Sequence, residues 1–275
     1  MKNPTVVAIA LLVLGTFFFV GCWGSGDGVS EPVLLYRSVG SETTVQFVNN
    51  PVPVNNVTVE DLDGNTISSH DWHGKVTFVN FWATWCRPCL EEIPDLVKLQ
   101  ERYGDYLQII GVSTDDGSVE RVKEFVQEHG INYPVVMNTP ELQDAFPGVF
   151  ALPTSFILDL EVQTVQKHVG LVNPYVFEQE IRVLAGLQTD VTVVRVEDTG
   201  QVLLLNAAQA TEIPDLDLSE LTAEQKVAVL HRLNEDSCPC ECQMTVAQCR
   251  INDASCQFSL PKAQAVLEDV LRSEL

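Results

Sequence analysis

Residues 81–89 read Phe81-Trp82-Ala83-Thr84-Trp85-Cys86-Arg87-Pro88-Cys89, with two cysteines separated by two residues. A mostly apolar run precedes them from Val76 to Trp82, and a helical pattern follows, so the sequence predicts a strand that ends where a helix begins. The free N–H groups of a helix start favour a thiolate, because they carry about half an elementary charge. Cysteine pairs in such a setting have lowered pKa values and carry out thiol–disulfide exchange. We therefore expect Cys86 to attack a disulfide and Cys89 to resolve the resulting mixed disulfide.

The residues around the first cysteine fit this role. Arg87 adds a positive charge beside Cys86, and Pro88 suits the first helical turn, where its missing N–H is not needed. Trp85 is a candidate for an apolar wall beside the thiol. Two alternatives to redox chemistry are a zinc site and a structural disulfide. A structural bridge, however, would not require the Trp-Cys-x-Pro-Cys setting.

Two motifs resemble the membrane-anchored TlpA/ResA-type thiol–disulfide oxidoreductases of bacteria, within the thioredoxin superfamily. The first is Val79-Asn80-Phe81-Trp82-Ala83-Thr84-Trp85-Cys86-x-Pro88-Cys89-x-x-Glu92-x-Pro94. The second is Leu152-Pro153-Thr154-Ser155-Phe156-Ile157-Leu158-Asp159, which is similar to the family's cis-proline loop and the strand after it. The resemblance covers about residues 50–187, which we take as the thioredoxin-like domain.

The resemblance implies a substrate site and a class of partner. Pro153 is expected to be cis and to face the disulfide, and the backbone at Leu152 is expected to bind an extended client segment together with Trp85 and Arg87. Protein disulfides or dithiols are the implied clients, as in cytochrome c maturation, and an upstream membrane protein would supply electrons. No organic cofactor is implied beyond the Cys86–Cys89 pair. The direction of electron flow depends on the reduction potential.

Glu92 is the candidate acid–base group. It lies three residues after Cys89 on the predicted helix, so the two share a face. A partly buried carboxylate with a raised pKa can accept the proton of the resolving thiol, and the resemblance implies this role for Glu92. Asn80 stands where thioredoxins carry a buried aspartate, and it cannot titrate. The alternative is a solvated helix glutamate, which we expect Glu91 to be.

Alternating buried strands and amphipathic helices predict an α/β protein. Together with the resemblance, they indicate a thioredoxin-like fold with a central mixed sheet and flanking helices. A small hairpin around Asp63-Gly64 is expected before the core. Strands are expected at residues 75–82, 107–112, 133–137, 154–158 and 168–172, with helices at 88–103 and 119–129 and a last helix between Asn173 and Gly186.

The N-terminal residues indicate export. Lys2 precedes an apolar run from Val6 to Val20, shorter than the ~20 residues of a spanning helix and suited to a signal-peptide core. Phe19-Val20-Gly21-Cys22 resembles a bacterial lipobox, in which Cys22 is lipidated; the alternative is an uncleaved N-terminal anchor. We expect a signal peptide at residues 1–21, a tether at 22–49, and a membrane-anchored lipoprotein facing the periplasm or cell exterior. The net charge of −22 argues against nucleic-acid binding.

Residues 188–275 are predicted to form a small, mainly helical, cysteine-rich C-terminal module. Its pattern indicates a hairpin at residues 191–196 and 201–205, then an acidic linker at 212–220. Helices are expected at 223–233 and 261–271, with a short helix after Thr245. Five cysteines with the spacing C-x-C-x-C-x6-C-x6-C lie between them: Cys238, Cys240, Cys242, Cys249 and Cys256.

Three interpretations of these five cysteines remain open. The first possibility is two disulfides. Cysteines with a single residue between them are poorly placed to bridge each other, and an odd number of cysteines leaves one thiol unpaired. A soft-metal site for Cu(I) or zinc, with help from Met244, is the second, and it would make the chain a copper-handling protein. The third is a redox relay or tethered substrate for Cys86 and Cys89.

Overall fold

The computed structural model describes residues 44–197, 208–240 and 242–273. The predicted signal peptide, the lipobox with Cys22 and the start of the predicted tether lie outside the described residues. Among the described residues, no helix has the length and apolar character needed to span a membrane.

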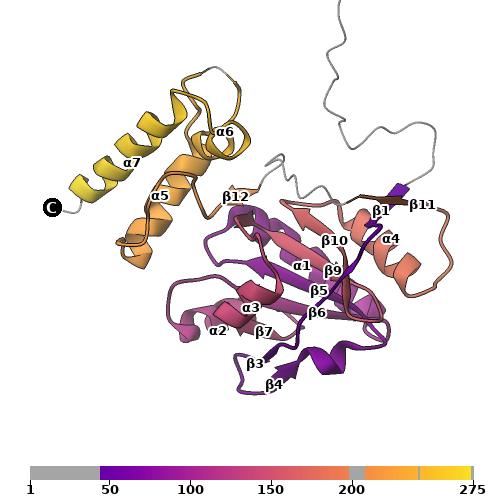
Figure 1. The fold of residues 1–275 in the computed structure, drawn as a ribbon. Coiled ribbons are helices and arrows are strands. Elements are labelled where there is room, and N and C mark those ends of the chain that lie inside the picture. The colour runs from indigo at the N-terminus through magenta and orange to yellow at the C-terminus, as the bar shows by residue number, and fades with distance from the viewer. Residues whose placement is uncertain (1–43, 198–207, 241, 274–275) are drawn as a thin grey trace, which may run out of the picture. The chain divides into compact units, whose positions relative to one another are not determined.

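A mixed six-stranded sheet forms the centre of the fold (Figure 1). Its central strand, β5 (Val76–Trp82), is buried along its whole length because both faces of the sheet are covered. The strand order is β2-β10-β9-β5-β6-β7. Strands β5, β6 (Leu107–Ser113) and β7 (Val135–Met137) run parallel, whereas β9 (Thr154–Leu158), β10 (Gln163–Val169) and β2 (Val52–Pro53) each run antiparallel to their neighbour. The predicted mixed sheet of a thioredoxin-like fold is confirmed.

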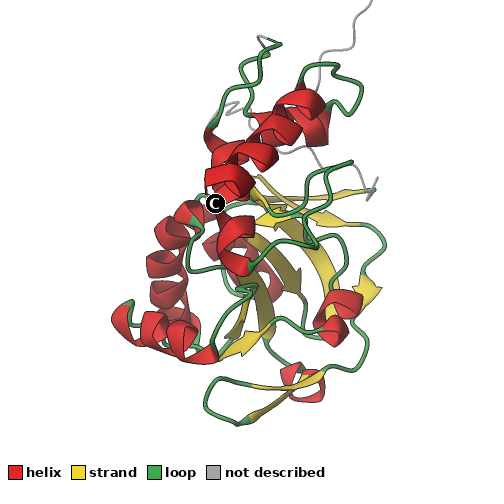
Figure 2. Ribbon diagram, turned by 90° about the vertical axis from the view of Figure 1, so that its left-hand side faces the viewer, coloured by secondary structure: helices red, strands yellow, loops and turns green. Residues whose placement is uncertain are grey.

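Helices lie on both faces of the sheet (Figure 2). Side chains of β5 contact them from each face. On one face, Phe78 packs edge-on against Phe177 of α4 (Pro174–Leu184), and Trp82 packs against Phe125 of α2 (Val119–Glu128). The same face carries Asn80, which contacts α1 (Arg87–Tyr103). The other face is closed by aromatic rings near α3 (Pro140–Ala145) and the 3-10 helix η1 (Ser69–Trp72).

The predicted hairpin before the core is present as β3 (Thr58–Glu60) and β4 (Thr66–Ser68). Gly64 has a φ of 85°, which a glycine adopts without strain in this turn. The predicted strand at residues 168–172 is wrong in its bounds, because β10 begins at Gln163. A tight turn joins β9 directly to β10. In this turn, Asp159 Oδ1 accepts hydrogen bonds from the backbone N–H groups of Glu161 and Gln163.

The predicted hairpin at residues 191–196 and 201–205 stays a prediction, but its first strand also makes a long-range pairing. Strand β11 (Thr192–Val196) runs parallel to β1 (Thr44–Val48), and residues 201–205 lie outside the described residues. Strand β1 lies within residues 22–49, where a tether is predicted. Val45 and Phe47 alternate along it and are buried in the same core as β5. This alternation is the sequence signal for β1.

The C-terminal module contains the three expected helices (orange to yellow in Figure 1). Capping boxes start two of them, Thr222 with Gln225 at α5 (Ala223–Glu235) and Thr245 with Gln248 at α6 (Val246–Asn252). The last helix is α7 (Ser259–Ser273). The three helices and a short strand, β12 (Gln209–Ala210), pack around a second apolar core, which includes Ile213, Leu218, Val229, Leu230, Leu233, Val246, Ala247, Val266 and Val270.

Candidate active site

Cys86 and Cys89 form a disulfide at the start of α1, with their Cα atoms 5.3 Å apart. Cys86 is the N-cap residue of the helix, and its Sγ accepts a hydrogen bond from the backbone N–H of Cys89 at 3.3 Å. Pro88 lies in the first helical turn, as predicted. The end of strand β5 and the start of α1 therefore place the first sulfur at the positive end of the helix dipole, where a thiolate is favoured.

Both cysteines are buried, whereas the side chain of Arg87 lies on the exposed surface of the helix. The exposed fraction of Cys86 is 0%. The Arg87 side chain is 82% exposed and forms an ion pair with Glu91 at 3.6 Å along the helix surface. Exposed pairs of this kind contribute little, so the helix start, more than Arg87, is the source of positive potential at Cys86.

Glu92 lies on α1 three residues after Cys89 and is buried, with an exposed fraction of 3%. Its Oε2 accepts a hydrogen bond at 2.9 Å from Asn80 Nδ2, which also donates to Ser155 Oγ at 2.9 Å. Burial raises the pKa of Glu92 to about 7, although the hydrogen bond from Asn80 lowers it. The expected buried carboxylate with a raised pKa is thus present, and the alternative of a solvated glutamate is wrong for Glu92. Such a group can exchange a proton near neutral pH.

A second buried polar pair lies near Glu92 and was missed by sequence reasoning. His168 Nε2 lies 2.9 Å from Oε1 of Glu180, which is 1% exposed. Burial lowers the pKa of His168, but the charge and hydrogen bond of Glu180 outweigh burial and raise it above its usual value. The charge of His168 in turn favours ionised Glu92. The available sequence signal was Glu180 itself, which interrupts the apolar face formed by Phe177 and Ile181.

The loop at Pro153 lies at the same edge of the sheet as the cysteines. Strand β5 ends just before Cys86, and the antiparallel β9 begins just after Pro153, with Phe81 opposite Thr154. The Leu152–Pro153 peptide bond is cis, as the resemblance implied. Leu152 is fully buried, and it stands opposite Gln209 of β12 in an antiparallel pairing.

Asp115 fixes the loop that carries Trp85 and Cys86, and sequence reasoning missed it too. Its carboxylate accepts hydrogen bonds from the backbone N–H of Thr84 at 3.0 Å and from Thr84 Oγ1 at 2.6 Å. Ser113 Oγ, at the end of β6, donates to the same carboxylate at 2.8 Å. These three bonds hold the segment before Cys86 against the end of the neighbouring strand. A polar residue directly after a buried strand was the signal in the sequence.

The C-terminal module contacts this edge. Strand β12 pairs antiparallel with β8 (Ala151–Leu152), directly before Pro153. Trp85 is half-buried and packs against both apolar cores. The first turns of α5 line a cavity together with Thr84 and Trp85, and Lys226 of α5 forms an ion pair with Asp116 at 2.9 Å.

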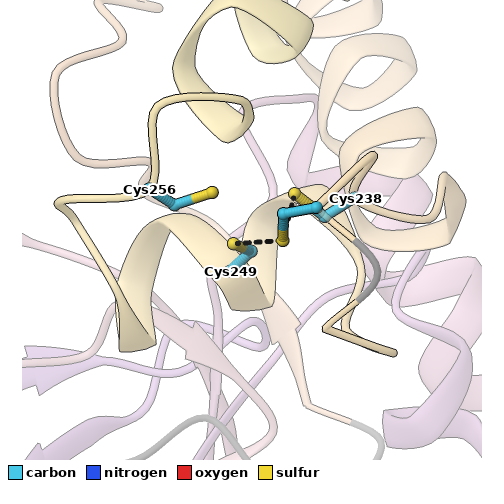
Figure 3. Close-up of side chains that lie close together, drawn as sticks. Cys238, Cys249 and Cys256 are labelled. Carbon is cyan, nitrogen blue, oxygen red and sulfur yellow. Dashed lines mark hydrogen bonds between the residues drawn. The ribbon is translucent and has the colours of Figure 1, made fainter.

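Four of the five C-terminal cysteines converge (Figure 3). The sulfurs of Cys238, Cys240, Cys249 and Cys256 all lie within 4.8 Å of one another. All five C-terminal cysteines are free thiols in the structure, so the predicted two disulfides are not seen. Met244 is engaged elsewhere, since its Sδ accepts a hydrogen bond from Asn252 Nδ2 at 3.4 Å.

Comparisons with known proteins support the redox interpretation. The AhpC/TSA family matches residues 48–167. The thiol-disulfide oxidoreductase ResA of Bacillus thuringiensis (strain Al Hakam) is 36% identical over 137 residues, which are 50% of this chain and 78% of that protein. The thioredoxin-like protein YneN of Bacillus subtilis (strain 168) is 31% identical over 125 residues, 45% of this chain and 73% of that protein.

Among solved structures, a thiol:disulfide interchange protein of the thioredoxin family from Chlorobium tepidum TLS is 34% identical. The match covers 50% of this chain and 98% of that chain, with a TM-score of 0.47. The match to ResA extends over more than three quarters of that relative. The chain therefore belongs to the ResA-type thiol–disulfide oxidoreductases.

Proposed function

We propose that the protein works outside the cytoplasm and reduces disulfides in partner proteins through Cys86 and Cys89. The observation that carries this proposal is the cysteine pair at the start of α1 above a buried Glu92 with a pKa of about 7. This arrangement supplies both a stabilised thiolate and a proton acceptor for the second thiol.

The proposed reaction has two exchange steps. The Cys86 thiolate attacks one sulfur of the client disulfide, forms a mixed disulfide and releases the other client sulfur as a thiolate. Glu92 then takes the proton from the Cys89 thiol. The Cys89 thiolate attacks Cys86 Sγ, so the Cys86–Cys89 disulfide forms and the second client thiol leaves. Two electrons pass from the pair to the client, and an upstream dithiol donor returns the pair to its reduced form.

The position of the protein in the cell is part of the proposal. The apolar run at residues 6–20 and the lipobox-like sequence ending at Cys22 support export and lipid anchoring. Replacement of Cys22 by serine should abolish incorporation of a labelled fatty acid, whereas Cys242→Ser should leave it intact. Labelling that persists in the Cys22 variant would contradict lipidation at that residue.

A redox titration and a turnover assay test the function. We expect the Cys86–Cys89 pair to titrate as a two-electron couple near the thioredoxin value of about −270 mV, as suits a reductase. With dithiothreitol as donor, the wild type should accelerate insulin reduction, and Cys86→Ser should abolish this acceleration. A potential above roughly −180 mV would instead indicate an oxidant or isomerase. Equal insulin reduction by the wild type and Cys86→Ser would contradict the assignment of Cys86 to the active site.

A further inference from the structure

The four converging thiols of the C-terminal module lie on separate short segments that meet at one point. Cys238 and Cys240 follow α5, Cys249 lies in α6, and Cys256 lies in the turn before α7. Cys240 Sγ is 3.3 Å from Cys238 Sγ and 3.8 Å from Cys249 Sγ (Figure 3). The four sulfurs thus bring together the segment after α5, the middle of α6 and the turn before α7.

The spacing of these sulfurs matches a single tetrahedral ion. A Zn–S bond of about 2.3 Å places tetrahedral thiolates about 3.8 Å from one another. Two disulfides would instead join the sulfurs in pairs at about 2 Å. A tetrahedral set of four sulfurs is typical of zinc, and Met244, the expected thioether for copper, is not among them.

The backbone around the cysteines is held in place by hydrogen bonds of its own. The loop between α5 and α6 is closed by bonds from Cys238 N to Met244 O and from Val246 N to Asp236 O, both at 2.9 Å. The guanidinium of Arg250, which is buried, donates to the carbonyl of Ala254 at 2.8 Å and so positions the turn before Cys256. The four ligands are therefore pre-arranged by the fold, as a structural metal site requires.

We propose that Cys238, Cys240, Cys249 and Cys256 bind one Zn²⁺ ion as a structural site that holds the C-terminal module together. The module has a small apolar core, and small domains commonly gain stability from such an ion. Each thiol releases a proton on binding, and no electron is transferred. Cys242 lies outside the group of four, although its thiol interacts with those of Cys240 and Cys249. Met244, whose sulfur is bonded by Asn252, provides the matched control in the same loop.

Metal analysis of the full chain, purified under reducing conditions, tests the site. We expect one zinc per chain in the wild type and in Met244→Leu, which removes the sulfur that bonds Asn252. Zinc affinity, measured by competition with a chromophoric chelator, should fall by at least about 100-fold in Cys249→Ser and Cys256→Ser, because loss of even an outer-shell partner weakens a metal roughly 10–100-fold. Unchanged affinity in these variants, equal loss in Met244→Leu, or copper or iron in place of zinc would overturn the proposal.

A protection experiment on the wild type covers the case in which variants fail to fold. Reduced protein loaded with Zn²⁺ is treated with iodoacetamide, and the modified peptides are identified by mass spectrometry. We expect the four cluster cysteines to react at least tenfold more slowly with zinc than without it. Unprotected cluster thiols, or disulfides among them in the zinc-treated protein, would overturn the proposal.

A second inference rests on the pairing of β12 with β8, and it depends on the proposed function. Thr211 donates its backbone N–H to Phe150 O at 2.9 Å, which extends the pairing of β12 beside Pro153. The side chain of Asn234 in α5 holds β12 in place by two hydrogen bonds. Its Oδ1 accepts from the backbone N–H of Ala210 at 2.7 Å, and its Nδ2 donates to the carbonyl of Ala210 at 2.9 Å. Edges of this kind bind extended peptides by strand addition. We infer that β12 occupies the client-binding edge and leaves it when a client reaches Cys86.

Variants of the full chain test this occupation. Thr211→Pro removes the N–H that bonds Phe150, whereas the matched control Thr211→Ala keeps it. We expect Thr211→Pro, and independently Asn234→Ala, to speed insulin reduction and alkylation of reduced Cys86 by about tenfold, and Thr211→Ala to match the wild type. Equal rates in all four proteins would overturn the occupation. Absence of insulin reduction in every protein, including the wild type, would instead contradict the proposed function.

Discussion

Asn80 Nδ2 donates a hydrogen bond to Glu92 Oε2 at 2.9 Å in the buried space beneath the redox cysteines. The same amide group bonds Ser155 of β9, so the central strand, α1 and β9 meet at one polar contact inside the core. A buried carboxylate held in this way has a pKa of about 7, because burial outweighs the hydrogen bond that favours its charged form. The pH dependence of the protein should therefore report on Glu92.

We expect Glu92→Gln to slow the resolution of a mixed disulfide at Cys86 by about 100-fold at pH 8, because proton acceptance by a placed base contributes about that much. In the wild type the rate should rise as Glu92 loses its proton near pH 7, and in the variant this rise should be absent. Rapid-quench kinetics with a preformed mixed disulfide measures the step. Glu91→Gln is the matched control, because Glu91 is exposed and its loss should change nothing. Equal effects of the two substitutions would argue against a role for Glu92.

Asn80→Leu should move the same pH midpoint upward by about one unit. The substitution removes one of the interactions that favour ionised Glu92, the hydrogen bond from Asn80, while burial is unchanged, and one pKa unit corresponds to about 1.4 kcal/mol. The midpoint is read from the pH profile of mixed-disulfide resolution. Ser155→Ala serves as the control, since it leaves the Asn80–Glu92 bond in place. A midpoint that moves downward in Asn80→Leu would contradict this account of the Glu92 pKa.

The free energy of unfolding should depend on Glu92 between pH 4.5 and 7. The pKa of Glu92 is raised from 4.5 in the unfolded chain to about 7 in the folded protein, so the folded state binds the proton more tightly. Its contribution is full below pH 4.5 and is lost as the pH rises through 7, a change of roughly 3 kcal/mol at ~1.4 kcal/mol per unit. Urea unfolding of the wild type and Glu92→Gln at several pH values measures it.

The raised pKa of His168 acts in the same direction as that of Glu92, because its contribution is present at low pH and lost as the pH rises through the folded value. The difference between the wild type and Glu92→Gln therefore reports on Glu92 together with its charge interaction with His168. The stability of the wild type should fall more steeply with pH than that of the variant. Parallel pH profiles would show that Glu92 is not protonated more readily in the folded state.

The sequence predicted the elements whose signals are local. The apolar run of β5, the helix that begins at the cysteine pair, the helix at 223–233 and the short helix after Thr245 each have a signal within a few residues, and each is confirmed. The family motifs added the fold and the cis bond before Pro153. These features need no knowledge of distant parts of the chain.

What the sequence did not predict depends on contacts between distant segments. Strands β1 and β11 pair across almost 150 residues, for example Thr44 with Thr192, and no local pattern indicates that register. The His168–Glu180 pair joins a strand to a helix, and each residue alone is compatible with a surface position. The four C-terminal thiols likewise converge through the packing of three helices. Their sequence spacing matches no familiar zinc pattern, so it did not indicate this convergence.

The central claim is that Cys86 is the attacking sulfur and Cys89 the resolving one, and trapping of a mixed disulfide tests it most directly. Cys89→Ser is reduced, mixed with a protein disulfide client, quenched in acid and digested for mass spectrometry. We predict a covalent adduct through Cys86 in Cys89→Ser and no adduct in Cys86→Ser. An adduct through Cys256 or another C-terminal cysteine, or none in Cys89→Ser, would contradict the claim.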